Sequence, residues 1–165
     1  MNKEILIIQT GGTIDKEYPR LTKGYAFEIG EPSIKRILSK INPSFTYEIV
    51  SVLKKDSTDI TKEDRQKIYD VCEDAQQERI VITHGTDTMV DTAKELVSLK
   101  EKTIIITGSM RPEKFSDSDA DFNIGLAFGA VQTLPPGIYI SMHGIVAPWE
   151  KVSRNEETGQ YFVEV

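Results

Sequence analysis

Short apolar runs and amphipathic stretches alternate along the chain, with little sequence left between them. Two continuous apolar runs, at residues 79–83 and 103–107, are typical of strands that are covered on both faces of a sheet. Similar strand-like runs lie at residues 4–9, 47–53 and 137–142. Five strands separated by helices predict a parallel α/β sheet with right-handed crossovers.

Helical periodicity fills the segments between these strands. Apolar residues recur at helical spacing after Glu31-Pro32-Ser33 and within residues 89–99. The segment from Thr61 to Asp64 resembles a capping box, with Asp in the usual place of Glu, and an apolar stripe follows it. A further helix is expected over residues 119–132. The pattern predicts a three-layer, doubly wound, mostly parallel sheet of the Rossmann or flavodoxin-like kind.

The C-terminal part has a weaker pattern. Residues 142–155 are expected to form a long loop, and residues 156–160 a hairpin turn before a last β-like run at residues 161–165. The chain contains no internal repeat, low-complexity segment or clear linker. We therefore expect a single domain over residues 1–165.

Composition narrows the class of protein. The 165 residues are 39% hydrophobic and 28% charged, as in ordinary globular domains. A formal charge of −6 without a basic tail argues against a nucleic-acid partner. No apolar run approaches the ~20 residues that span a bilayer, and the N-terminus lacks the apolar region of a signal peptide. We expect a cytoplasmic protein that does not bind membranes.

The chain has too few cysteines and histidines to form a disulfide or a metal site. The lone Cys72 excludes an intramolecular disulfide. A metal site would need more ligands than His84 and His143 supply, so we expect no metal.

Polar residues gather where three predicted strands end, at residues 10–13, 56–59 and 84–88. Because ligands of parallel α/β sheets bind outside the carboxyl ends of the strands, these exits are candidate binding loops. Gly11 and Gly12 allow backbone N–H groups to approach a ligand closely, but they suit a plain tight turn equally well. A dinucleotide site would need Gly-x-Gly-x-x-Gly followed by a helix, and neither is present.

The third exit carries an acid with two interpretations. Asp87 lies where a strand gives way to a helix, so it can cap that helix. Its other interpretation is an ion pair with a substrate ammonium or a catalytic lysine. His84 follows a buried strand directly and is expected to be a structural hydrogen-bonding residue rather than a base.

Five ordered segments together resemble the bacterial-type L-asparaginase family. The two signature motifs of that family are similar to Thr-Gly-Gly-Thr-Ile at residues 10–14 and His-Gly-Thr-Asp-Thr-Met at residues 84–89. Supporting matches are Asp-Ser-Thr-Asp-Ile-Thr at 56–61, Thr-Gly-Ser-Met-Arg-Pro at 107–112 and Ser-Asp-Ser-Asp-Ala-Asp-Phe-Asn at 116–123. The resemblance runs from about residue 4 to residue 155 and implies the fold of an asparaginase N-terminal domain.

The resemblance implies a role for each matching residue. Thr13 would be the nucleophile, and Tyr25 would help to take its proton, because a threonine hydroxyl needs such activation. Thr86 would be the second hydroxyl of a Thr–Lys–Asp constellation, and Asp87 would pair with the α-ammonium of the substrate. The substrate-binding residues implied in this way are Gly12, Asp56, Ser57, Thr58, Gly85, Thr86 and Asp87.

Plainer interpretations remain for some of these residues. Tyr25 can be an ordinary loop aromatic, and Ser57 and Thr58 can be hydroxyls at the entry of a helix. Backbone N–H groups beside Thr13 and Thr86 are reasonable donors to an oxyanion.

The chain departs from the family pattern at the expected lysine. An ungapped alignment from Met142 places Arg154 there, and arginine cannot be deprotonated in a protein. Lys151 lies three residues earlier and can substitute if the loop shifts.

The chain also stops before the C-terminal domain that typical family members carry. It therefore resembles the short, single-domain asparaginases. We expect a site that is either more open or completed by a partner surface. We also expect a homo-oligomer, built on the exposed sheet edge or on the tail.

The resemblance implies an amidohydrolase that converts L-asparagine to L-aspartate and ammonia through an acyl-enzyme on Thr13, without a cofactor. One alternative is a glutaminase or a hydrolase of another amide, because the same threonine chemistry serves it. Another is a catalytically weak protein that binds aspartate or asparagine, in which Arg154 has replaced the lysine. A purely structural role would not explain why hydroxyls and acids converge at three strand exits.

Overall fold

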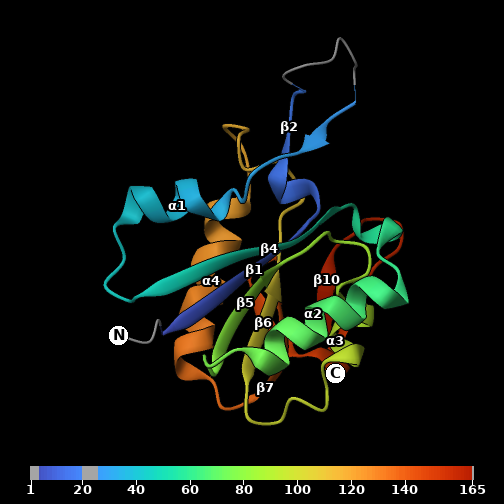
Figure 1. The fold of residues 1–165 in the computed structure, drawn as a ribbon. Coiled ribbons are helices and arrows are strands. Elements are labelled where there is room, and N and C mark those ends of the chain that lie inside the picture. Colours follow the sequence, from blue (N-terminus) through green and yellow to red (C-terminus); the bar gives the residue numbers. More distant parts are fainter. Residues whose placement is uncertain (1–3, 20–25, 165) are drawn as a thin grey trace.

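A six-stranded sheet with helices on both faces forms the centre of the computed structural model, which describes residues 4–19 and 26–164 (Figure 1). The strands, in their order across the sheet, are β4 (Tyr47–Lys55), β1 (Ile5–Gly11), β5 (Arg79–Thr83), β6 (Thr103–Thr107), β7 (Gly137–Met142) and β8 (Ile145–Pro148). The first five run parallel, and β8 is antiparallel to β7. The predicted mostly parallel α/β sheet is confirmed.

In the described part of the chain, four helices cover the two faces of this sheet. They are α1 (Ile34–Ile41), α2 (Lys62–Asp74), α3 (Met89–Glu95) and α4 (Ala120–Thr133). Because side chains alternate along a strand, Leu6 and Ile8 join the apolar cluster beneath α2 and α3. Ile5 and Ile7 join the other cluster, beneath α1 and α4. The three-layer arrangement follows from this alternation.

Shorter elements of the described chain form two small sheets and three turns apart from the main sheet. They are the antiparallel pair β2 (Lys16–Glu17) and β3 (Glu28–Ile29), the antiparallel pair β9 (Val152–Arg154) and β10 (Tyr161–Val163), and the 3-10 turns Thr13–Asp15, Ser57–Asp59 and Trp149–Lys151. Tyr25 falls between β2 and β3 but lies outside the described residues.

The C-terminal part is more ordered than the long loop expected over residues 142–155. β7 turns back into β8 through His143 and Gly144, whose φ values are 52° and 83°. Two left-handed residues in succession are what a tight two-residue hairpin requires. The sheet therefore has a sixth strand besides the five expected ones, and the expectation of a loop over residues 142–155 is wrong. The expected turn at residues 156–160 is confirmed, since Asn155 N–H donates to the Gln160 carbonyl across it.

The capping box predicted for α2 is confirmed. The Thr61 hydroxyl accepts from Asp64 N–H at 3.2 Å, and the Asp64 carboxylate accepts from Thr61 N–H at 3.1 Å. Lys55 Nζ donates to the same carboxylate at 2.6 Å. The helix expected over residues 89–99 is shorter than predicted, because α3 ends at Glu95 and the chain continues in turns.

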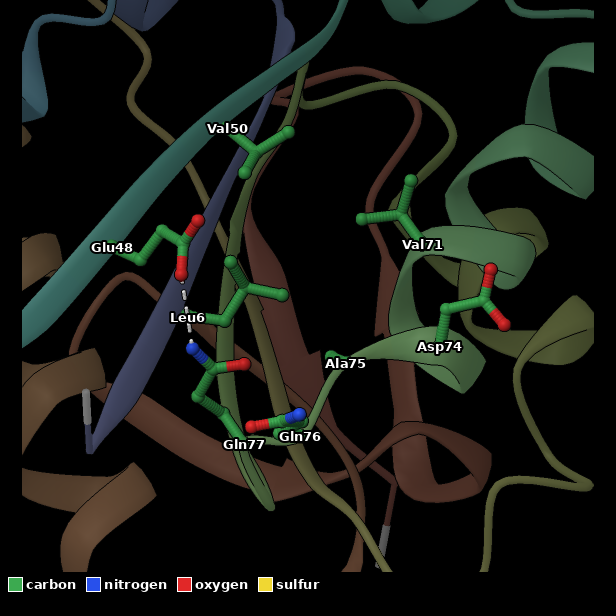
Figure 2. A pocket seen from close by; sticks show the side chains of 8 residues that line it. All are labelled: Leu6, Glu48, Val50, Val71, Asp74, Ala75, Gln76 and Gln77. Carbon is green, nitrogen blue, oxygen red and sulfur yellow. Dashed lines mark hydrogen bonds between the residues drawn. The ribbon is translucent and has the colours of Figure 1, made fainter. Parts of the chain in front are cut away.

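A hollow of about 350 Å³ opens between β4 and the C-terminal end of α2 (Figure 2). Its walls come from Leu6, Glu48, Val50, Val71, Asp74, Ala75, Gln76 and Gln77. Leu6 and Glu48 lie near the amino ends of their strands, so this hollow is at the opposite end of the sheet from the polar strand exits.

None of the helices in the described part of the chain is both long and apolar enough to cross a membrane.

Candidate active site

The order of the parallel strands determines where a ligand site is expected. Counted along the chain, the five parallel strands lie in the order 2-1-3-4-5, which is that of flavodoxin-like folds. The crossovers diverge between β1 and β5, and ligands of such sheets bind at the carboxyl end of that switch point. The loops that follow β1 and β5 contain Thr13 and Asp87, two of the residues singled out in the sequence.

Two glycines bring the strand exits into direct contact. A Cβ atom built on Gly12, whose φ is 83°, would lie 2.4 Å from Gly85 Cα. A Cβ atom built on Gly85 would lie 2.7 Å from Ser57 Cβ. Only glycine permits both approaches, because such distances are far below van der Waals contact. The exits of β1, β4 and β5 therefore meet at one point.

Thr13 begins the 3-10 turn that follows β1 and is half-buried. The turn is anchored by Asp15, which is buried and accepts Ser33 N–H at 2.8 Å and the Gln9 amide at 3.0 Å. Burial raises the pKa of Asp15. The Thr13 hydroxyl itself has no hydrogen bond to any other described residue, so it is available to a ligand.

The β4 exit contributes Ser57, which is 2% exposed. Its hydroxyl accepts Asp87 N–H at 3.1 Å, and its carbonyl accepts the Thr88 hydroxyl at 2.9 Å. The neighbouring Thr58 is exposed, and Asp56 is ion-paired with Lys16 at 2.8 Å.

Asp87 does not cap α3. The residue at the start of that helix is Thr88, and no side chain caps the helix. The Asp87 carboxylate instead lies 3.0 Å from Arg154 Nη2. The carboxylate remains 48% exposed, so it can also receive a ligand cation.

Arg154, and not Lys151, reaches Asp87. Its side chain is 18% exposed, and its other terminal nitrogen lies 3.6 Å from Glu156. Lys151 lies exposed at the end of a 3-10 turn and forms no ion pair with another described residue. No hydrogen bond links Arg154 to Thr86 within residues 4–19 and 26–164, so the implied Thr–Lys–Asp constellation is only partly reproduced.

His84 is fully buried and structural. Arg65 Nε donates to the Thr92 hydroxyl at 3.2 Å, and that hydroxyl lies 2.7 Å from His84 Nε2. His84 Nδ1 lies 2.7 Å from the Gly85 carbonyl, so the neutral ring donates there and accepts from Thr92. Burial lowers the pKa of His84 to about 4. The ring supports the β5 exit and is not placed to act as a base at Thr13.

Tyr161, which the sequence did not single out, also contacts the β5 exit and is itself bonded to His143. The Tyr161 hydroxyl donates to the Thr86 carbonyl, and Tyr161 N–H donates to His143 Nδ1 at 3.2 Å. Neither residue belongs to a recognisable motif. The only available signal was the predicted turn at residues 156–160, which brings Tyr161 back toward Arg154.

The described residues contain no group of three or more His, Cys, Asp or Glu side chains arranged to hold a metal ion. The arrangement instead combines a free hydroxyl on Thr13 with an exposed carboxylate on Asp87 beside the guanidinium of Arg154. These are the components of a site that attacks the amide or ester of a small charged substrate.

The fold and the site together define an α/β protein of the asparaginase class. The family model described as "Asparaginase, N-terminal" matches residues 4–160, and the chain belongs to this family.

Several curated relatives extend the comparison. An L-asparaginase of Thermococcus kodakarensis is 29% identical over 162 residues, which cover 94% of this chain and 49% of that protein. An L-asparaginase of Bacillus licheniformis is 31% identical over 75% of this chain and 40% of its own length. A glutamyl-tRNA(Gln) amidotransferase component of Sulfolobus acidocaldarius is 32% identical over 87% of this chain and 34% of its own length. The chain thus spans half or less of these relatives.

Solved structures agree with this assignment. The thermostable L-asparaginase of Thermococcus kodakarensis superposes with a TM-score of 0.78 at 26% identity, over 96% of this chain and 50% of that one. L-asparaginase I of Vibrio cholerae superposes with a TM-score of 0.81 at 24% identity, over 99% of this chain and 52% of that one, and supports the fold.

Proposed function

We propose that the chain is an amidohydrolase that converts L-asparagine to L-aspartate and ammonia. The proposal depends above all on one observation. The contact between Gly12 and Gly85 brings the loop with the free Thr13 hydroxyl against the loop with the exposed Asp87 carboxylate. Family membership and the L-asparaginase relatives support the same reaction.

The reaction takes place in two halves. The Thr13 oxygen forms a bond to the side-chain carbonyl carbon of asparagine, while the phenol of Tyr25 accepts the hydroxyl proton and passes its own proton on toward the leaving nitrogen. Backbone N–H groups beside Thr13 and Thr86 stabilise the oxyanion, a contribution often of about 3 kcal/mol per donor. The C–N bond breaks and the nitrogen leaves as ammonia with the proton. Water then attacks the acyl-enzyme, which releases aspartate and returns the proton to Thr13.

Substrate binding uses the polar groups around Thr13. Asp87 pairs with the α-ammonium of the substrate, and Ser57 and Thr58 hold its α-carboxylate and α-amino ends. Gly12, Gly85 and Asp56 line the same loops. Arg154 supplies a positive charge next to Asp87. Lys151 is the alternative source of this charge, if the loop shifts.

The second candidate is hydrolysis of glutamine or of a conjugated glutaminyl amide. One relative is named a glutaminase-asparaginase, of Acinetobacter glutaminasificans, at 25% identity. The depth of the substrate pocket decides between these amides. The third candidate is a protein that binds aspartate without hydrolysing the amide, because Arg154 cannot act as a base.

Ammonia release from asparagine and glutamine, measured side by side, tests these proposals. We expect release from asparagine that falls by at least about 1000-fold in Thr13→Ala, because the nucleophile is lost. Thr133→Ala on the surface of α4 is the matched control and should retain full activity. Release from glutamine alone would favour the second candidate. Aspartate binding without any release would favour the third.

We also propose a cytoplasmic homo-oligomer. β4 is an edge strand, and an unpaired strand edge is a ready surface for a second copy. Light scattering at the assay concentration tests the assembly, and cell fractionation tests the location. A monomer with full activity would contradict the oligomer.

A further inference from the structure

Two side chains of the hairpin formed by β9 and β10 contact the β5 exit. Arg154 and Tyr161 are directly opposite each other in this hairpin. Their side chains contact consecutive residues of the β5 exit, since Tyr161 bonds to the Thr86 carbonyl and Arg154 pairs with the Asp87 carboxylate. Two residues that are paired across the hairpin, Arg154 and Tyr161, therefore hold two consecutive residues, Asp87 and Thr86.

Tyr161 is suited to a fixed donor role. It is only 2% exposed, and burial raises the pKa of its phenol, so the hydroxyl stays protonated and can donate. The Thr86 carbonyl that accepts this bond precedes the Asp87 N–H, and that N–H donates to the Ser57 hydroxyl. The peptide unit between Thr86 and Asp87 is thus held at its carbonyl and at its N–H.

His143 holds Tyr161 from the other side. Its backbone φ is 52°, a left-handed conformation that costs conformational free energy in residues other than glycine. Glycine or asparagine is the usual choice at this position of a tight hairpin. The histidine instead contributes an aromatic ring. Its Nδ1 accepts Tyr161 N–H, and the ring stacks on Tyr161 at a centroid distance of 6.2 Å.

We propose that Tyr161 is a positioning residue of the candidate active site. Held by His143, it fixes the Thr86–Asp87 peptide and so aims the Asp87 carboxylate at the α-ammonium of the substrate. The proposal rests on the function proposed above, because the ammonium is the group that Asp87 would bind. A ligand without that ammonium should not respond to the loss of the tyrosine hydroxyl.

Calorimetry with two dicarboxylates tests this role. In Tyr161→Phe we expect the affinity for aspartate to fall about tenfold, which corresponds to the loss of one buried hydrogen bond. The affinity for succinate, which lacks the amino group, should change less than twofold. The matched control is Tyr139→Phe, since the buried Tyr139 also donates its phenol to a backbone carbonyl, that of Pro135 at 3.1 Å.

Amide hydrogen exchange provides a readout that does not depend on catalysis. We expect the Asp87 amide to exchange about tenfold faster in Tyr161→Phe and unchanged in Tyr139→Phe. His143→Asn, which keeps a residue suited to the turn but removes the ring, should change the exchange in the same direction by a smaller factor.

The outcomes separate the two proposals. If the wild-type protein releases no ammonia from any amide, the proposed function fails, and the exchange of the Asp87 amide still decides the role of Tyr161. If Tyr161→Phe weakens aspartate and succinate equally, or leaves the Asp87 amide unchanged, the positioning role is overturned.

Discussion

Arg154 determines the charge of the candidate site at the scale of single residues. A guanidinium keeps its proton at every pH in which proteins fold, whereas a lysine can lose its proton when the surroundings disfavour charge. At 3.0 Å from Asp87, Arg154 compensates the carboxylate permanently. It serves as an electrostatic partner and cannot relay a proton.

Arg154→Lys should therefore restore proton transfer at this position. We expect kcat for asparagine to rise by about tenfold or more, because general acid–base catalysis contributes 10²–10⁴-fold where it operates. KM should change little, since the positive charge next to Asp87 is kept. Steady-state ammonia release measures both constants. A lower kcat in Arg154→Lys would show that the planar guanidinium itself is required.

At the scale of elements, the stability of α2 depends on its first turn. The helix is highly charged, and the capping box of Thr61 and Asp64 satisfies two backbone N–H groups that have no partner within the helix. Lys55 holds Asp64 at the same point, so the end of β4 and the start of α2 are joined.

Thr61→Ala removes one of these bonds. We expect the free energy of unfolding to fall by about 1 kcal/mol, and the melting temperature by about 2–4 °C for a domain of this size. Thermal unfolding followed by circular dichroism measures the change. Thr133→Ala is the control, because its threonine ends a helix instead of starting one. Equal melting temperatures for the two variants would exclude a stabilising role for the cap.

Sequence patterns located the central elements well for a physical reason. Strands buried on both faces must be apolar throughout, so residues 79–83 and 103–107 were identified with the bounds that β5 and β6 have. β8 and β9 are not marked by such an apolar run in the sequence. They are only four and three residues long, and their positions depend on contacts with distant segments instead of on local periodicity.

The same distinction applies to the site. Hydroxyls, acids and glycines at the strand exits are visible in sequence, and the fold brings Gly12, Ser57 and Gly85 together as the sheet rule requires. Tyr161 was not visible, because it bonds to a backbone carbonyl that any residue at position 86 would offer. Its role appears only once the hairpin is placed in space.

At the scale of the whole molecule, buried titratable groups link stability to pH. The fold holds the pKa of His84 down to about 4, whereas an exposed histidine titrates near 6.5. The unfolded chain therefore binds a proton between these values that the folded chain does not, so stability is lost as the pH falls through this window. Asp64, whose bond to Lys55 lowers its pKa to about 2, adds a further loss below its ordinary value of 3.8.

Urea unfolding at several pH values tests this linkage. Between pH 6.5 and pH 4 we expect the folding equilibrium constant to fall by up to about tenfold per pH unit because of His84. His84→Gln should be less stable at pH 7 but should show a flatter pH dependence in the same window. An unchanged slope in that variant would mean that other groups control the acid sensitivity.

The hairpin of β9 and β10 also gives the assembly of the site a temporal order. Ribosomes synthesise proteins from the N-terminus, so all six strands of the main sheet, which end at Pro148, precede Arg154 and Tyr161. A nascent chain can thus hold its complete sheet while Thr86 and Asp87 still lack both cross-strand partners. On this view the hairpin, which is synthesised after the sheet, sets the moment at which the substrate-binding carboxylate is aimed.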